Sequence, residues 1–550
     1  MSLAPRTHEP IPDETVRVAR AAFPKGNIYL RLRDELGPIF ADAQFADLFA
    51  WRGQPGESPS QLILVSIMQY LEKLTDRDAA DMVRSRIDWK YLLGLPLEDS
   101  GFDFSVLSEF RTRLIEGSAE RQLLDTFLRV IQERGLVKRG GQQRTDSTHV
   151  LAAVRQMNRI ELLTECLRRA LDAVAAVAPD WLASWVTVAW YERYGRRSEA
   201  YRLPHKEKEQ AIWLKQVGAD GYTLLDQLWQ QDTETAWRQL PAIDALRRIW
   251  VQQYYRNEEQ IHLRQEKQDG IPPHERLIVS PDDLDARYRT KRETHWQGYV
   301  VHLTESCDVD SPHLITDVQT TPATVGDAPV LPDIQQNLSE RDLLPAEHLV
   351  DTAYVSAPHL VNSQTKGIDL IGPVPADNSW QNRTPDAFTV ACFSLDWVAQ
   401  VATCPLGHTS QSWKHRHPGQ DKAYLEITFP RALCQECSVR QQCTRSAKGS
   451  RVLHLQPQAR FDMLLTARQR QKEAPFKRLY QRRAGIEGTL SQGVRSMDLR
   501  HSRYIGLAKT HLQHVFTGLA INFQRLYAWF EGVPLARTRV SHFAALAPTT

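Results

Sequence analysis

The sequence lacks the long apolar runs that cross membranes. No stretch of about 18 or more apolar residues occurs, and the mean hydropathy is -0.44. The opening residues, MSLAPRTHEPIPDE, contain no apolar core of the kind that a secretory signal peptide carries. We therefore expect a chain without a membrane span, located in the cytoplasm.

Cysteines are few and odd in number, and charge of either sign is nearly balanced. Seven cysteines in 550 residues argue against the disulfide framework of a small secreted protein. The formal net charge is only +2, so no overall field points to a polyanionic partner. With 42% hydrophobic residues the chain can bury a substantial core, and its length suggests roughly two to four domains.

Helical patterns dominate residues 28–135. The segment SPSQ at 58–61 combines an N-cap Ser, a Pro at the first helical position and a Gln at the third. The segment TDRD at 75–78 opens the next helix with similar chemistry, and a third helix, SVLSEFRTRL, carries Arg111 and Arg113. A compact module of this kind is either a helix-turn-helix DNA reader or simply a helical domain.

The next part of the chain, residues 136–374, has the pattern of a mixed α/β sheet that is interrupted after its first strand. A short β-like stretch ends in Asp146, and residues 155–270 are helical and rich in Trp, which we attribute mainly to core packing. The later elements are strands at 296–304, 313–320, 347–355 and 366–374, with a helix from Ala328 to Leu338. This order predicts a mixed α/β sheet with a helical insertion at about 150–290.

The remaining segments complete the predicted organisation. Residues 1–135 form a helical N-terminal domain whose first 25 residues or so, Pro-rich and polar, are a loose lead-in. Residues 375–458 form a small, β-rich insertion that contains a cysteine cluster, and residues 459–532 return to the α/β core as basic helices. Residues 533–550 are a C-terminal tail.

Three acidic residues stand out by their positions. Asp146 ends the first strand, Asp351 ends a later strand, and Glu487 lies on a long basic helix. Phosphodiester chemistry uses clustered carboxylates to hold two metal ions about 3.5–4 Å apart, and oxygen ligands suit Mg²⁺ and Mn²⁺. The ordinary alternative is that a strand-end Asp forms a turn or a cap. Asp317, also in a strand-like run, is a rival for the middle position.

The surroundings of Glu487 add local support. Tyr480, Arg483 and Glu487 are three and four residues apart, so they share one helical face. Residues 461–510 contain eleven Lys or Arg against four Asp or Glu, a net charge of +7. A single Glu among so many cations either pairs with them or binds metal beside phosphate.

These residues resemble the DDE transposases of bacterial insertion sequences. Tyr480, Arg483 and Glu487 match the spacing of the signature around the third acid, and TDSTHV and VDTAYVS resemble the segments around the first two Asp. The N-terminal segment FSVLSEFRTRL resembles the helical domain often joined to these enzymes. The resemblance extends from about residue 40 to 530, and it selects Asp351 over Asp317.

The resemblance implies an RNase H-like fold in which Asp146, Asp351 and Glu487 are the catalytic residues and the ligands of Mg²⁺ or Mn²⁺. It implies cleavage at transposon ends and joining of the 3′-OH ends to target DNA, by a homodimer associated with the nucleoid. In that reading the candidate DNA-binding residues are Tyr480, Arg482, Arg483, Arg495, Arg500 and Arg503.

One position departs from the family signature. The signature often has a Lys seven residues after the Glu, where this chain has Val494 followed by Arg495.

Two other functions fit the same sequence. One is a DNA-binding regulator derived from a transposase, which the presence of all three acids disfavours. The other is a nuclease of the same fold that cuts DNA without strand transfer.

The late cysteines suggest metal. Cys434, Cys437 and Cys443 follow one another at short spacing, and Cys404 precedes them in the segment CPLGH. A structural Zn²⁺ site needs four ligands in tetrahedral geometry, and either Cys443 or His408 completes the set. Reduced cysteines without metal, or an iron–sulfur cluster, are the alternatives.

Overall fold

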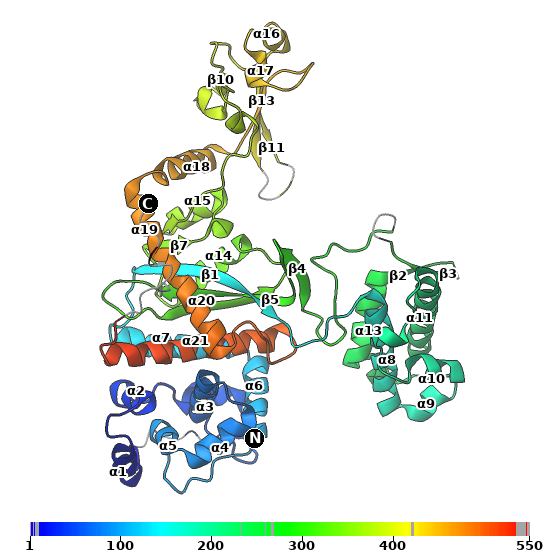
Figure 1. Ribbon diagram of the computed structural model, residues 1–550, viewed down its shortest axis with the longest axis vertical. Helices are drawn as coiled ribbons and strands as arrows, with labels where there is room; N and C mark the ends of the chain where they lie inside the picture. Colours follow the sequence, from blue (N-terminus) through cyan, green and yellow to red (C-terminus); the bar gives the residue numbers. More distant parts are fainter. Residues whose placement is uncertain are drawn as a thin grey trace.

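The computed structural model describes all residues except 1, 4, 6–9, 231–232, 259, 266–268, 418, 420–422, 535–545 and 547–550. The predicted C-terminal tail therefore lies mostly outside the described residues. Figure 1 shows four parts: N-terminal helices in blue at the bottom, a central sheet, a helical insert to the right and a small β module at the top. No helix in the described part of the chain is long and apolar enough to cross a membrane.

The N-terminal part of the chain is helical. Its α-helices are α1 (Asp13–Ala22), α2 (Ile28–Leu36), α3 (Pro59–Glu72), α4 (Asp76–Ser85), α5 (Ile87–Leu93), α6 (Ser105–Glu116) and α7 (Glu120–Glu133). The expected caps are present: Ser58 accepts the amide N–H of Gln61, and Thr75 forms a capping box with Asp78. The prediction of a loose lead-in was wrong, because helix α1 forms within that segment and buries Ala19 against the neighbouring helices.

The N-terminal helices share their core with the rest of the molecule. Helix α21 (Leu507–Phe530) packs against α3 and α7 and also against the sheet. Tyr70 of α3 stacks on Phe516 of α21, with ring centroids 5.8 Å apart. One hydrophobic cluster runs from α2 through α21 to the central strands. The division at residue 135 thus marks a change of secondary structure, while the packing is continuous across it.

The central sheet is mixed, and β1 (Gln142–Leu151) lies in its middle. β1 pairs antiparallel with β5 (Thr294–Ser306) and parallel with β7 (Glu347–Val350), and β8 (Asp369–Ile371) lies parallel beyond β7. β5 also pairs antiparallel with β4 (Arg287–Lys291) near its start and with β6 (Ile315–Pro322) further on. Helices α14 (Leu331–Glu340) and α15 (Ala357–Thr365) follow β6 and β7.

These elements follow the predicted strand order, with several differences. The strand predicted at 347–355 ends at Val350, because Asp351 caps a 3₁₀ turn, and the strand predicted at 366–374 is limited to Asp369–Ile371. β4 was not predicted. Asp146 does not end the first strand: it is the fifth of the ten residues of β1, because pairing with β5 continues to Leu151. Thr148 and Val150 keep alternate side chains buried beyond it, which prolongs the strand.

The helical insert has a hydrophobic core of its own. Its helices are α8 (Arg159–Val177), α9 (Pro179–Ala183), α10 (Val188–Tyr194), α11 (Glu207–Leu228), α12 (Thr235–Arg238) and α13 (Pro241–Gln253). Trp190 and Trp250 are buried in this core, and other Trp side chains pack against it, as expected for core aromatics. The helical prediction to residue 270 was wrong at its end, where a hairpin forms from β2 (Tyr254–Asn257) and β3 (Gln260–Leu263).

Residues 375–458, where the sequence predicts a β-rich insertion, contain short strands and two short α-helices, called the β module below. Its elements are β9 (Ser394–Asp396), β10 (Val401–Thr403), β11 (Ser412–Arg416), β12 (Tyr424–Thr428), α16 (Arg431–Gln435), α17 (Arg440–Cys443) and β13 (Val452–Leu455). After it come α18 (Gln458–Arg470), α19 (Ala474–Tyr480) and α20 (Ala484–Met497). The single long helix predicted around Glu487 is broken by a 3₁₀ turn, Gln481–Arg483.

Candidate active site

Asp146 and Asp351 lie on neighbouring parallel strands. Thr145 of β1 is in register with Val350 of β7. Asp146 follows the first of these residues and Asp351 follows the second. Adjacent strands are about 4.8 Å apart, and the carboxylates are therefore neighbours at the point where β7 ends. Asp351 also caps the 3₁₀ turn Thr352–Tyr354, accepting the amide N–H of Thr352 at 2.6 Å.

Glu487 reaches the same place through Arg483. Helix α20 packs on β1, and Glu487 lies in its first turn. The guanidinium of Arg483 donates from Nη1 to Asp146 Oδ2 at 2.9 Å and from Nη2 to Glu487 Oε1 at 2.6 Å. The Glu487 side chain is 61% exposed, whereas that of Asp146 is 18% exposed. Arg483 is thus the cation between the first and third acids.

Three carboxylates and the guanidinium of Arg483 meet at this point, so the acids outnumber the cation. Burial raises the pKa of Asp146, and the neighbouring Asp351 carboxylate adds to the rise, although Arg483 opposes it. Burial also raises the pKa of Tyr480, again with a contribution from Asp351. Burial opposes the charged form of Arg483, but Asp146, Tyr480 and Asp351 raise its pKa. A further cation would be stabilised here.

A buried polar network supports the Asp351 turn. Tyr354 is fully buried, and its hydroxyl lies 2.7 Å from His302 Nδ1 on β5. Ser147 of β1 donates to Asp327 at 2.9 Å, and the same Asp327 oxygen lies 3.9 Å from His302 Nδ1. The sequence carried no signal for this network, because its members come from four separate segments.

Arg144 and Gly485 fix α20 on the sheet. Arg144, two residues before Asp146, is buried and donates to Glu305 at 2.6 Å and to the carbonyl of Arg482 at 2.6 Å. A Cβ at Gly485 would overlap the guanidinium of Arg144. Close approach of the helix therefore requires glycine here. Sequence reasoning missed both residues, although the Arg directly precedes the TDSTHV segment.

Asp317, the rival for the middle position, lies elsewhere. It is buried on β6 and accepts from Arg341 at 2.5 Å. Arg341 also binds Asp125 of α7, so the pair joins the sheet to the N-terminal helices. The structure brings Asp351, and not Asp317, next to Asp146.

The predicted DNA-binding residues occupy different environments. Arg482 and Arg495 are exposed, and Tyr480 and Arg483 border the acids. Arg500 donates to Thr148 at 2.9 Å, two residues along β1 from Asp146. Arg503 faces the N-terminal helices, donating to the carbonyl of Leu74 at 2.9 Å.

The N-terminal Arg residues singled out in the sequence are used within the protein. Arg111 is 6% exposed and forms an ion pair with Asp76. Arg113 lies over the ring of Phe49, with its guanidinium carbon 5.2 Å from the ring centroid. These contacts hold helices together, so the two Arg give no support to a DNA-reading role for α6.

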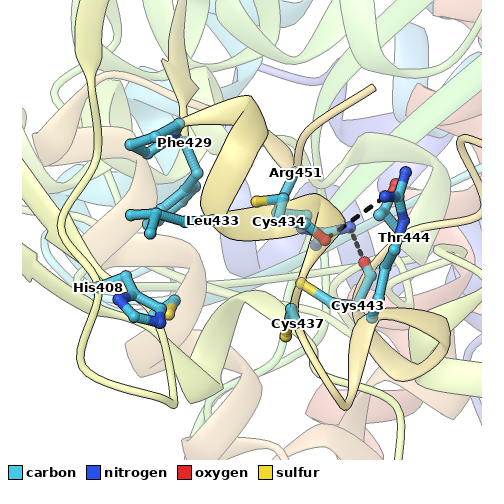
Figure 2. A pocket seen from close by; sticks show the side chains of 11 residues that line it. His408, Phe429, Leu433, Cys434, Cys437, Cys443, Thr444 and Arg451 are labelled. Atoms are coloured by element: carbon cyan, nitrogen blue, oxygen red, sulfur yellow. Dashed lines mark hydrogen bonds between the residues drawn. The ribbon is translucent and has the colours of Figure 1, made fainter. Parts of the chain in front are cut away.

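The cysteine cluster is assembled in the β module. Cys404, Cys434, Cys437 and Cys443 line one small cavity of about 30 Å³, together with His408 (Figure 2). All seven cysteines are free. Burial raises the pKa of Cys443 to about 11, and the other three thiols of the cluster contribute. Among the described residues, no three or more His, Cys, Asp or Glu side chains are arranged to hold a metal ion, here or at the carboxylates.

Two family models match the chain. One, described as a transposase DDE domain, matches residues 403–527, and the other, described as a transposase domain (DUF772), matches residues 17–113. The first range contains the cysteine cluster and Glu487 but neither Asp; the second covers most of α1 to α6. No match was found among curated proteins or solved structures. A DDE domain implies an RNase H-like fold, and the mixed sheet with its helices is consistent with it.

Proposed function

Since both matches indicate a DDE transposase of the insertion-sequence type, we propose that this chain binds the ends of an insertion sequence, cleaves the DNA there and joins the 3′-OH ends to target DNA. One observation carries the proposal: Asp146 and Asp351 are neighbours on parallel strands, and Arg483 ties Glu487 to the same place. In this proposal the three acids are catalytic.

The donor set fits Mg²⁺ or Mn²⁺. All three side chains offer carboxylate oxygens, which these ions prefer. Asp351 repels the charged form of Asp146 and so helps to raise its pKa. A divalent cation bound between the two carboxylates would offset this repulsion. When bound, two ions would activate the attacking hydroxyl and stabilise the leaving oxygen. Asp146, Asp351 and Glu487 would hold them.

The chain's own residues position the DNA and the acids. Arg483 holds Asp146 and Glu487 in their relative orientation, and Arg144 holds the start of α20 on β1. Arg500 is anchored about 7 Å along β1 from Asp146, where its guanidinium can bind a phosphate. Arg482 precedes Glu487 along the chain and Arg495 follows it, and both side chains are exposed. Together with Arg500 they offer positive charge to the DNA backbone. Tyr480 and Arg483 border the acids and complete the contacts to the end phosphates, whereas Arg503 is turned toward the N-terminal helices.

Charge-removing variants of the three acids test the proposal. Asp146→Asn, Asp351→Asn and Glu487→Gln keep side-chain size but weaken metal binding. The assay is Mg²⁺-dependent cleavage of the element's end DNA, in which each variant should lose nearly all activity and keep DNA binding. Glu473→Gln is the matched control, because Glu473 is an exposed acid of the same basic segment. Full activity in any of the three variants would remove that residue from the site.

A second assay separates transposition from the related functions. Pre-cleaved ends with a free 3′-OH are incubated with target DNA and Mg²⁺, and joined products are measured. Joining is expected for a transposase, cutting without joining indicates a nuclease, and binding without either indicates a regulator. The mass of the complex with two end duplexes tests the homodimer that pairing of the ends requires.

We also propose that the β module holds one structural Zn²⁺ on Cys404, Cys434, Cys437 and Cys443. Their place around a single cavity supports this, since four thiolates are a common structural zinc ligand set. Elemental analysis of the purified protein should find about one zinc per chain. Cys434→Ser should lose it, and Cys392→Ser should keep it, because Cys392 is exposed and lies outside the cavity. Iron would indicate a cluster instead, and absence of metal would indicate reduced thiols.

A further inference from the structure

Lys73 joins the N-terminal helices to the end of α20. It follows α3 in a left-handed conformation, with φ 59°, where glycine is the usual residue. Its Nζ donates to the carbonyl of Arg495 at 2.7 Å, in the last turn of α20. A lysine in this strained position, with its ammonium at another helix, suggests that the side chain has a use beyond ending α3.

Cations without acidic partners gather where α3 meets α20. The acids closest in sequence to Lys73 are Glu72 and Asp76, and these pair with Arg86 and Arg111. Near Arg495 the acid is Asp498, which pairs with His501. Among the described residues none forms an ion pair with Lys73 or Arg495, and both side chains are exposed. The seam between the two helices therefore presents two exposed cations that no carboxylate in the described part of the chain neutralises.

This seam lies further along α20 than the candidate active site. Arg495 is eight residues after Glu487 on α20, which is about 12 Å along the helix axis. That distance corresponds to roughly three to four base-pair rises of duplex DNA. Arg503, which donates to the carbonyl of Leu74, holds the end of α3 in place beside α20.

We propose that Lys73 and Arg495 together bind the DNA backbone a few base pairs from the cleavage point, so that the N-terminal helices contribute directly to the DNA interface. This rests on the proposed function, because it places DNA along α20. Sequence reasoning included Arg495 but missed Lys73, which is more than 400 residues away along the chain. The ammonium binds phosphate through its charge, without reading base sequence.

The test is salt-dependent binding of the full-length chain to a labelled random-sequence 40-base-pair duplex. Lys73→Gly removes the charge and relieves the left-handed strain, so its unfolding temperature should equal or exceed that of the wild type. Loss of one phosphate contact should weaken binding about fivefold at 0.15 M salt and lower the slope of log K against log salt by about 0.9. Lys73→Arg should retain wild-type binding. Lys25→Gly, in the exposed turn after α1, is the control and should change nothing.

The outcomes separate this inference from the proposed function. If Arg495→Ala weakens binding while Lys73→Gly leaves affinity and slope unchanged, Lys73 only ends a helix and the inference fails. The proposed function would then stand. If the wild type shows no salt-dependent binding to DNA, both fail. Retained acid-dependent cleavage with weakened binding in Lys73→Gly supports both.

Discussion

The contact between Gly485 and Arg144 provides a sharp test of how the site is built. Helix α20 can lie on β1 only because residue 485 has no side chain, since a Cβ would overlap the Arg144 guanidinium. That guanidinium cannot easily move aside: it is buried and donates to Glu305 and to the carbonyl of Arg482. Gly485→Ala should therefore lift the start of α20, and with it Glu487, away from Asp146.

The loss of stability in Gly485→Ala is measured against a matched variant, Gly488→Ala. Gly488→Ala lies on the same helix, and its Cβ would meet nothing within 4 Å. Both substitutions gain about 1 kcal/mol of helix propensity, so this gain cancels in the comparison. The overlap at residue 485 should cost about 1–3 kcal/mol, rising toward 3–5 kcal/mol if Arg144 is forced away from buried Glu305. Gly485→Ala should thus unfold earlier in urea than Gly488→Ala.

Activity should suffer more than stability. A displacement of about 1 Å at a catalytic group can cost about 100-fold in rate, so Gly485→Ala should cleave end DNA far more slowly than Gly488→Ala. The double variant Gly485→Ala/Arg144→Met gives the decisive result. Arg144→Met alone should destabilise, but adding Gly485→Ala should then cost nothing, because the overlapping atoms are gone. Equal behaviour of the two alanine variants, or additive effects in the double variant, would refute this account.

Two further predictions concern helix α21 and the core that it shares with the N-terminal helices. Burial, together with the neighbouring His511, lowers the pKa of His514 on α21 from 6.5 to about 3. Between these two pH values the unfolded chain binds a proton at this residue that the folded chain does not. The folded state is therefore progressively destabilised as the pH falls from 6.5 toward 3. His514→Gln should flatten the urea midpoint against pH between 6.5 and 4, whereas exposed His205→Gln should not, and an unchanged slope would contradict the assignment. Because α21 shares one core with the N-terminal helices, removal of residues 1–135 should give a chain that aggregates or lacks cooperative unfolding by circular dichroism; a stable, cooperatively unfolding remainder would show that the shared core is dispensable.

Several elements could be predicted because their signals are local. The caps at Ser58 and Thr75 depend on residues three apart, and both helices begin where expected. The order of strands and helices along the chain followed from short apolar runs separated by helices, and β5 to β8 occur in that order. The break in the helix before Glu487 was missed, because no Pro or Gly marks residues 481–483. The end of the first strand was also misplaced, because its pairing with β5 depends on residues about 150 positions away.

By itself the sequence identified three candidate acids, the basic segment around Glu487, the cysteine cluster and the family resemblance, because each is written in residue types at short spacing. Only the tertiary structure decided which acids are neighbours. It placed Asp351 beside Asp146 by parallel pairing of β1 and β7, and it placed Asp317 against Arg341. It also showed that Lys73 reaches α20 and that the N-terminal helices share the central core. These facts depend on contacts between residues hundreds of positions apart, which no local pattern encodes.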